Sequence, residues 1–288
     1  MRIIADLHTH TIVSHHAYST LEEMVAGAAR ANLAAIAITD HGPKMPDGAN
    51  DWHFCSMWIV PRVIQSVAVL RGGEANIISY DGEIDLSPAD LDFLDLTIAS
   101  LHSYAIEVGS TEQNTAVYQK MLRHPKIDIL GHPTDPPFTF DYEAVVRTAK
   151  ETGKALELNS HALRKNPDAI GRYKELALLC KKYGVWMTVS SDAHVSYEVG
   201  YFGPIPELLD ELEVPASSGL EELADSGTGR TLSENAEKVL GVLEKTPVHV
   251  SMLEEKTGLP ASSVLAVLTE LELEGIIRSY PGRRYSRA

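Results

Sequence analysis

Side chains that can bind metal ions form two short motifs in this 288-residue chain, His8-Thr9-His10 and Asp192-Ala193-His194. In each motif the two candidate ligands are two positions apart. Residues i and i+2 of an extended strand share a face, so both side chains of a pair can point into the same space. Imidazole and carboxylate groups without thiolates suit zinc, manganese or iron. The two motifs therefore predict metal chemistry.

Similar residues follow other predicted strands: Asp40-His41, Glu74, His102 and His132 stand at or just after apolar runs. A lone histidine at a strand end is usually structural or solvated, but six of the seven predicted strands carry such a residue, which favours a shared site. These ligands are too many for one ion with about four to six coordination positions. They fit two or three divalent ions, with a carboxylate such as Glu74 as a bridge.

A parallel α/β barrel would bring these strand ends together. Seven short apolar runs read as strands, at residues 2–7, 34–39, 67–72, 94–101, 127–130, 155–158 and 185–190. Helices are predicted between most of them, at 20–31, 111–122, 141–151 and 167–183, and Asp81-Gly82 marks a hairpin turn. In such barrels the active site lies at the C-terminal ends of the strands.

A second, smaller domain is expected at the C-terminus. Residues 215–232 are rich in Ser, Gly, Ala and acids, which is a linker composition. Helical patterns follow at 233–244, 250–257 and 260–274, and Pro281-Gly282-Arg283 separates two short β-rich runs. Three helices and a hairpin predict a winged helix-turn-helix. The expected domains are thus a barrel at 1–214, a linker at 215–232 and a winged helix at 233–288.

Composition excludes several classes of protein. The formal net charge is −15, so the surface as a whole would repel a free polyanion. Cys55 and Cys180 are the only cysteines, which excludes a disulfide framework and a cysteine-based zinc site. The N-terminus lacks the apolar core of a secretory signal, and no apolar run is long enough to span a bilayer. We expect a soluble cytoplasmic protein without membrane contacts.

Several motifs resemble those of the PHP (polymerase and histidinol phosphatase) family over residues 1 to about 212. They are Asp6-Leu7-His8-Thr9-His10, Ile38-Thr39-Asp40-His41-Gly42, Gly131-His132-Pro133 and Ser191-Asp192-Ala193-His194. The segments His16-Ala17-Tyr18-Ser19-Thr20 and Gly73-Glu74-Ala75-Asn76 are most similar to the small bacterial trinuclear-zinc phosphatases of this family. The resemblance implies a distorted seven-stranded (β/α) TIM-like barrel. The family usually adds a further helical stretch after the last motif, whereas here the chain soon enters the predicted linker.

The resemblance also implies three metal ions, zinc first, with manganese or iron as alternatives. By that likeness His8, His10, Glu74 and Asp192 hold one ion, Glu74 bridges to a second held with His102 and His132, and His16, His41 and His194 hold the third. The choice of His16 over His15 rests on the likeness alone. Seven of the nine are also expected to be catalytic: His8, His10, Glu74, His102, His132, Asp192 and His194.

Other polar residues near these motifs are given supporting roles. Asp40 is expected to orient a ligand imidazole as a hydrogen-bond acceptor. His53 and His161 are placed near the mouth of the barrel, where they could contact a substrate or simply pack. His15 is expected to be a neighbour of the site, and His124 and His249 ordinary surface or packing residues.

Residues 233–288 resemble the winged helix of DNA-processing protein A, with Pro247-Val248-His249-Val250 and Thr257-Gly258-Leu259-Pro260 among the similar segments. The would-be recognition helix at 260–274 holds Glu270, Glu272 and Glu274 but no Lys or Arg. Major-groove readers normally use Arg, Lys, Asn or Gln there, so the charges argue against sequence-specific DNA binding. A protein-interaction or dimerisation module is the alternative.

The expected function is hydrolysis of a small phosphomonoester by a metal-bridging hydroxide at a trinuclear site. One alternative is a nuclease or nucleotide phosphoesterase to which the winged helix presents nucleic acid. Another, of a different class, is a regulator that acts through the winged helix and whose barrel senses a metal or a phosphorylated ligand.

Overall fold

The structure is a computed structural model that describes residues 2–215, 234–259, 264, 267–268, 271–272, 276–280 and 284–287. The chain divides into two compact units, Met1–Val214 and Pro215–Ala288. Each is described by itself below.

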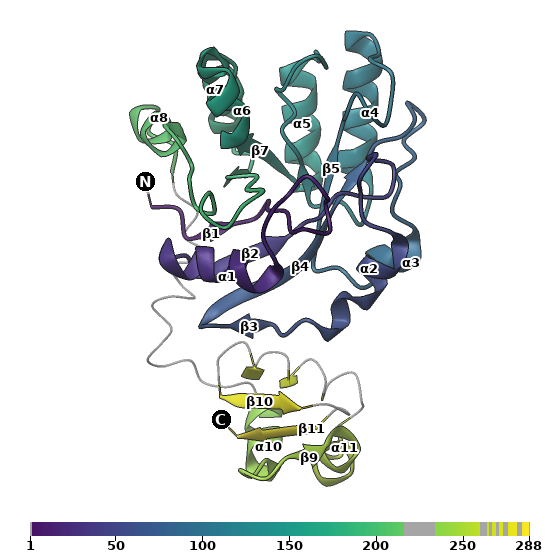
Figure 1. Cartoon of the computed structure of the whole chain (residues 1–288), viewed down its shortest axis with the longest axis vertical. Coiled ribbons are helices and arrows are strands. Elements are labelled where there is room, and N and C mark those ends of the chain that lie inside the picture. Colours follow the sequence, from purple (N-terminus) through teal and green to yellow (C-terminus); the bar gives the residue numbers. More distant parts are fainter. Residues whose placement is uncertain are drawn as a thin grey trace. The chain divides into compact units, whose positions relative to one another are not determined.

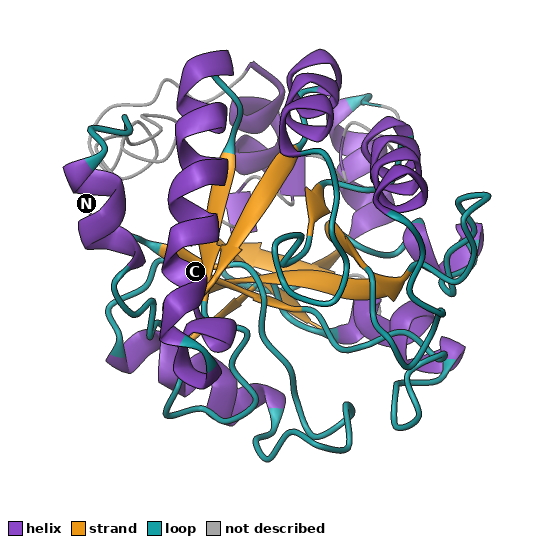
Figure 2. Ribbon diagram, turned by 90° about the horizontal axis from the view of Figure 1, so that it is seen from above, coloured by secondary structure: helices purple, strands orange, loops and turns teal. Residues whose placement is uncertain are grey.

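The N-terminal unit is built on a parallel sheet whose strands run in the order β1-β2-β4-β5-β6-β7-β8. The strands are β1 (Ala5–Asp6), β2 (Ala35–Ile38), β4 (Val67–Asn76), β5 (Leu96–Ser100), β6 (Ile129–Leu130), β7 (Ala155–Asn159) and β8 (Met187–Ser190). A short strand, β3 (Val63–Ile64), pairs antiparallel with β4. Figure 2 shows these strands at the centre of the unit with helices around them. The predicted α/β barrel of seven parallel strands is confirmed.

The helices of this unit are mostly crossovers between neighbouring strands (Figure 1). They are α1 (Leu21–Arg30), α2 (Asp51–Ser56), α3 (Pro88–Leu91), α4 (Thr111–Arg123), α5 (Tyr142–Thr152), α6 (Ser160–Lys165), α7 (Ile170–Tyr183) and α8 (Ile205–Glu211), with 3-10 turns η1 (Met57–Ile59) and η2 (Pro167–Ala169). Thr20 and Glu23 form a capping box that starts α1, and Gly153 and Gly184, with φ of 71° and 64°, end α5 and α7.

The structure adds to the predicted elements in three places. β4 continues to Asn76, so Glu74 lies inside a strand rather than after one. The short helices α2, α3 and α6 were not predicted, because one or two turns carry too little periodicity to be recognised. Finally, α8 follows β8 and packs against α7, so a helical stretch does cover this edge before the predicted linker.

The two edge strands, β1 and β8, approach each other and nearly close the barrel. Thr9 and Ala193 form a parallel bridge, and His10 N donates to Ala193 O at 2.9 Å. The buried carboxylate of Asp6 accepts hydrogen bonds from Ser191 N (3.0 Å), Ser191 Oγ (2.5 Å) and Gly200 N (2.9 Å). Burial nevertheless raises the pKa of Asp6 to about 6. This seam brings the two sequence motifs that flank it, at residues 8–10 and 192–194, side by side.

The C-terminal unit has the parts expected of a winged helix. They include α10 (Glu234–Val242), α11 (Val250–Thr257) and an antiparallel sheet in the order β10 (Ile277–Tyr280), β11 (Arg284–Arg287), β9 (Val248–His249). Its apolar core includes Ala236, Val239, Leu253 and Leu271. The predicted linker lies outside the described residues apart from Pro215, and so does most of the predicted helix at 260–274.

Among the described residues, no helix has the length and apolar character needed to cross a membrane.

Two helix glycines allow the packing of α1 against the segment after β8 to be tested. A Cβ on Gly27 would lie 2.4 Å from Ser196 O, whereas a Cβ on Gly171 in α7 would meet nothing within 4 Å. We expect Gly27→Ala to destabilise the protein by about 1–3 kcal/mol through overpacking. Gly171→Ala should stabilise it by about 0.5–1 kcal/mol through helix propensity. Urea unfolding of the two variants checks this, and an equal or reversed effect would contradict the close approach.

Candidate metal centre

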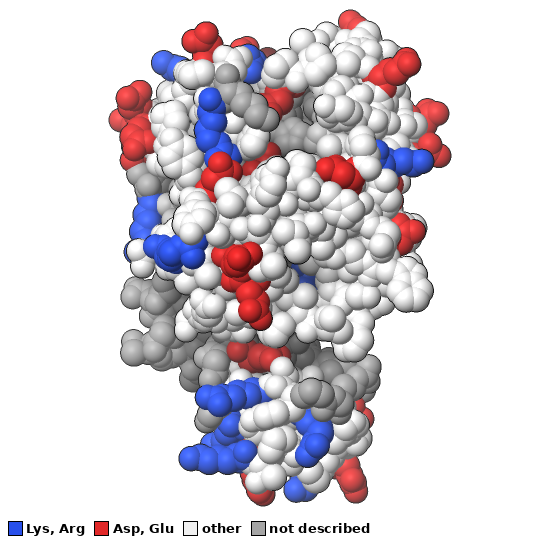
Figure 3. Space-filling model, viewed as in Figure 1, with Lys and Arg blue, Asp and Glu red and all other residues white. Residues whose placement is uncertain are grey.

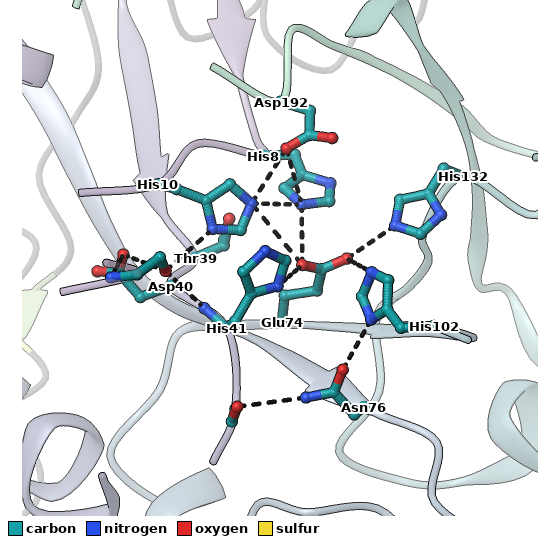
Figure 4. A network of polar contacts seen from close by, with 12 residues as sticks. His8, His10, Thr39, Asp40, His41, Glu74, Asn76, His102, His132 and Asp192 are labelled. Atoms are coloured by element: carbon teal, nitrogen blue, oxygen red, sulfur yellow. Dashed lines mark hydrogen bonds and ion pairs between the residues drawn. The ribbon is translucent and has the colours of Figure 1, made fainter. Parts of the chain in front are cut away.

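The carboxylate of Glu74 lies among imidazole rings at the C-terminal end of the barrel (Figure 4). Glu74 is fully buried in β4. Its Oε1 lies 2.9 Å from His132 Nε2 and 3.4 Å from His102 Nε2. Its Oε2 lies 2.5 Å from His41 Nδ1, 3.4 Å from His8 Nε2 and 3.7 Å from His10 Nε2. One carboxylate therefore contacts imidazoles that follow four other strands.

Asp192 supplies a second, largely buried carboxylate from the end of β8. Its Oδ1 lies 3.1 Å from His10 Nε2 and 3.7 Å from His8 Nε2. Asp192 and His132 have φ of 51° and 25°, in or near the left-handed region that non-glycine residues rarely adopt. Such backbone strain persists where the surrounding structure enforces it, and it is concentrated at functional sites.

His16 and His194 form the outer edge of the group. Their Nε2 atoms are 2.8 Å apart, and the His41 ring stacks on the His16 ring at 5.2 Å between centroids. His16 is the most exposed candidate, with 42% of its side chain accessible. Its Nδ1 lies 2.7 Å from Asp47 Oδ2, which keeps Nε2 turned toward His194.

The structure thus brings all nine predicted site residues together, but their closest groupings differ from the three sets implied by the family resemblance. Ligand atoms lie within 4.8 Å of one another in three overlapping groups: His8, His10 and Glu74; His41, Glu74 and His102; and His10, His41 and His194. His10 and His41 each take part in two groups. The nine residues therefore form one continuous cluster.

Most of these imidazole rings are hydrogen-bonded through the nitrogen that faces away from the cluster. His8 Nδ1 lies 2.9 Å from Glu157 Oε1, His102 Nδ1 lies 2.7 Å from Asn76 Oδ1, and His194 Nδ1 lies 2.9 Å from the carbonyl oxygen of Asp192. A histidine that donates from Nδ1 offers the lone pair of Nε2 to a metal. The hydrogen bonds therefore prepare these rings as ligands.

Glu157 was missed by the sequence analysis. It lies in β7, is fully buried, and its Oε2 accepts a hydrogen bond from His132 N at 2.7 Å. Asn159, two positions later on the same strand, donates from Nδ2 to Asp192 Oδ2 at 3.2 Å. The available signal was a carboxylate inside the otherwise apolar run Ala155-Leu156-Glu157-Leu158.

Asp40 has a different role from the one predicted. Its buried carboxylate accepts from Thr11 N, Thr11 Oγ1 and Ser14 Oγ, each at 2.8 Å, and so holds the loop after His10. It reaches His10 only through Ser14, whose Oγ lies 3.4 Å from His10 Nδ1. The ring that it faces directly is that of His53, whose Nε2 lies 3.3 Å from Asp40 Oδ2.

The charges of the cluster fit divalent metal ions. Burial by itself would raise the pKa of Glu74 and of Asp192, but the surrounding histidines hold both well below their usual range. Glu157 is also kept ionised, chiefly by His8, against its burial. Glu74 Oε2, Asp192 Oδ1 and His41 Nδ1 are buried. Although Glu74 Oε2 lies 2.5 Å from His41 Nδ1 and Asp192 Oδ1 lies 3.1 Å from His10 Nε2, none of the three atoms makes a well-aligned hydrogen bond. Buried charges are normally paired or bound to metals.

A cavity of about 240 Å³ opens onto the cluster. Six of the nine candidates line it: His16, His41, His102, His132, Asp192 and His194. Its other walls include Tyr104, Asp135, Phe138 and His161. A small molecule in this cavity would therefore contact the open faces of the proposed ligands.

Comparison with known proteins identifies the larger unit. The model of the PHP domain matches residues 6–224 of this chain. This chain belongs to the PHP domain family. The model of the DprA winged helix domain matches residues 224–283.

Individual PHP proteins are similar over the barrel. A probable phosphatase of Acetivibrio thermocellus is 42% identical over 215 residues, which cover 75% of this chain and 89% of that protein. A probable phosphatase of Clostridium acetobutylicum is 41% identical over 218 residues, 75% of this chain and 88% of that protein. The histidinol phosphate phosphatase of Lactococcus lactis, solved with zinc, L-histidinol and phosphate, shares the fold at 17% identity, with a TM-score of 0.53 over 72% of this chain and 92% of that one.

The contact between Glu157 and His8 predicts an effect on metal affinity. Glu157→Ala should lower the affinity for zinc about 10–100-fold, as is typical when the partner of a ligand histidine is lost. Glu157→Gln, which keeps an acceptor for His8, should lose less. Competition with a chromogenic chelator measures both. Glu151→Gln, on the exposed end of α5, is the control, and unchanged affinity in Glu157→Ala would contradict the orienting role.

Proposed function

We propose that residues 1–214 form a metal-dependent phosphomonoesterase with two or three bound divalent ions, zinc first and manganese or iron as alternatives. The observation that carries the proposal is the ionised, buried Glu74 among imidazoles that face a small cavity. Relatives named probable phosphatases, at about 40% identity over the whole barrel, support the reaction class. The proposed domain boundaries are 1–214 for the barrel, 215–232 for the linker and 233–288 for the winged helix.

The nine clustered residues would hold the ions. We assign His8, His10, Glu74 and Asp192 to one position, Glu74, His102 and His132 to a second, and His16, His41 and His194 to a third. When bound, divalent ions would offset the charge of the phosphate oxygens and lower the pKa of a coordinated water to roughly 7.

The protein's own groups bind and orient. Glu74 and Asp192 keep the ions at fixed spacing because both carboxylates stay charged in the buried site. When ions are bound, the ligand imidazoles would be neutral. Glu157, Asn76 and Asp47 orient the Nε2 lone pairs of His8, His102 and His16 for this purpose. Seven of the nine are proposed as catalytic, because they would hold the ions that contact the phosphoryl group: His8, His10, Glu74, His102, His132, Asp192 and His194.

The size of the cavity favours a small phosphomonoester. Its volume of about 240 Å³ is below the roughly 300–1,000 Å³ of pockets that enclose drug-sized ligands. A phosphoryl group and a short organic chain fit such a space. Two ester-linked groups fit it less well, so a phosphodiester is the weaker candidate.

The metal-loaded full-length protein should therefore hydrolyse p-nitrophenyl phosphate but not bis-p-nitrophenyl phosphate or single-stranded DNA. Activity should fall in EDTA and return with zinc or manganese, and Asp192→Asn should lose at least about 100-fold in kcat/KM because an amide cannot supply the anionic ligand. Preference for the diester or for DNA would favour the nuclease alternative. No hydrolysis by fully loaded protein would favour the regulatory one.

The bridging position of Glu74 predicts unequal metal loss. Glu74→Ala should lose two ions per chain, because Glu74 is assigned to two of the three metal positions. His16→Ala, at the exposed rim, should lose at most one. Elemental analysis of both variants beside the unmodified protein measures this. Equal losses would show that Glu74 is not the bridge, and one ion or fewer in the unmodified protein would exclude the trinuclear assignment.

A further inference from the structure

His161 forms part of the cavity wall but is not one of the nine proposed ligands. It follows β7 at the start of α6, where Asn159 Oδ1 accepts a hydrogen bond from His161 N at 2.8 Å and so fixes the backbone. Its ring lies 5.5 Å from the ring of His194, between centroids. His161 therefore stands beside the proposed ligands in the wall of the cavity.

The contact with Arg164 defines which nitrogen of His161 carries the proton. Arg164 Nη2 lies 2.7 Å from His161 Nδ1. A guanidinium group can only donate hydrogen bonds, so Nδ1 must be the acceptor. The proton of the neutral ring is then on Nε2. His161 is thus a hydrogen-bond donor at its far nitrogen, whereas the ligand histidines with a partner on Nδ1 present a lone pair there.

Arg164 is itself held in place from another part of the chain. Its Nη1 pairs with Glu198 Oε1 at 2.5 Å, and its guanidinium lies 6.0 Å from the centre of the Tyr201 ring. Ser160 Oγ donates to Tyr201 O at 2.6 Å and joins the same two segments. Because Glu198 and Tyr201 follow β8, the orientation of His161 depends on contacts across two strand ends.

The chemistry of the cavity calls for such a donor. The lining residues include two carboxylates, Asp135 and Asp192, which repel an anion, and the ligand imidazoles would be occupied by metal. A phosphate oxygen that no ion coordinates would need a hydrogen-bond donor from the protein.

We propose that His161 is a substrate-binding residue whose Nε2–H donates a hydrogen bond to an oxygen of the substrate phosphoryl group, and that Arg164 is a positioning residue that fixes this tautomer. The inference rests on the proposed phosphatase function. It assigns to this chain a phosphate contact that is distinct from metal coordination.

Binding of inorganic phosphate to the metal-loaded full-length protein, followed by calorimetry, tests the role of His161 without turnover. His161→Ala should weaken phosphate binding and raise KM for p-nitrophenyl phosphate about tenfold, the value of one hydrogen bond to a charged group. The metal content should not change. His161→Gln, whose amide can still donate, should stay within about threefold of the unmodified protein. His124→Gln, at the C-terminal end of α4 and outside the cavity lining, is the control.

The role of Arg164 has a spectroscopic signature. Long-range proton–nitrogen spectra should show His161 as the Nε2–H tautomer, and Arg164→Met should convert part of it to the Nδ1–H form with weaker phosphate binding.

Three results would overturn the inference: unchanged phosphate affinity in His161→Ala, loss of a metal ion in that variant, which would make His161 a ligand, or an Nδ1–H tautomer in the unmodified protein. Failure of the proposed function is separate, since it would appear as a metal-loaded unmodified protein that neither binds phosphate nor hydrolyses the monoester.

Discussion

The burial of charged carboxylates at the end of the barrel is the constraint on which the rest of the structure depends. Within the described residues, the ion pairs of Glu74 are all with imidazoles, and Lys and Arg take no part. A carboxylate removed from water costs several kcal/mol unless it is paired. Against their burial, the neighbouring carboxylates raise the pKa of His8 and of His132, so protonated imidazoles offset part of that cost. Divalent ions between the carboxylates and the rings would take over this role.

The barrel supplies the geometry that this balance needs. No single strand could place five imidazoles around one carboxylate, whereas parallel strands that converge at their C-terminal ends can. The seam between β1 and β8 matters most, because His10 and Asp192 come from its two sides. Asp6 joins these sides through three hydrogen bonds even though its own charge is disfavoured by burial. Hydrogen bonds at the seam thus maintain the spacing of the cluster.

The sequence predicted the strands and the long helices, because apolar runs and helix caps are local signals. Ligand-type residues at strand ends indicated most of the candidate ligands, but the full set of nine, with His16 rather than His15, came from the family resemblance. The sequence could not predict which of the candidate ligands lie closest together, since His10, His41 and Glu74 each belong to two groups and only distances show this. It also missed Glu157, because a carboxylate inside a strand is indistinguishable by pattern from one that points outward. Asp40 was misread for a related reason: its neighbour His41 suggested a contact that the loop at Thr11 and Ser14 makes instead.

The distribution of charge bears on what the protein can bind. The whole chain carries −15, so an anionic substrate would depend on bound metal ions for local positive charge. The repulsion grows with the number of phosphates on the ligand, so a monoester is penalised less than a nucleic acid. On the C-terminal unit, Figure 3 shows Lys and Arg side chains on the visible face, and Arg278 and Arg284 of the hairpin are exposed. The winged helix holds eight acidic residues against seven Lys and Arg, so the unit has no excess of positive charge. Repulsion from the acidic barrel therefore disfavours a polyanion more strongly than a small phosphoester.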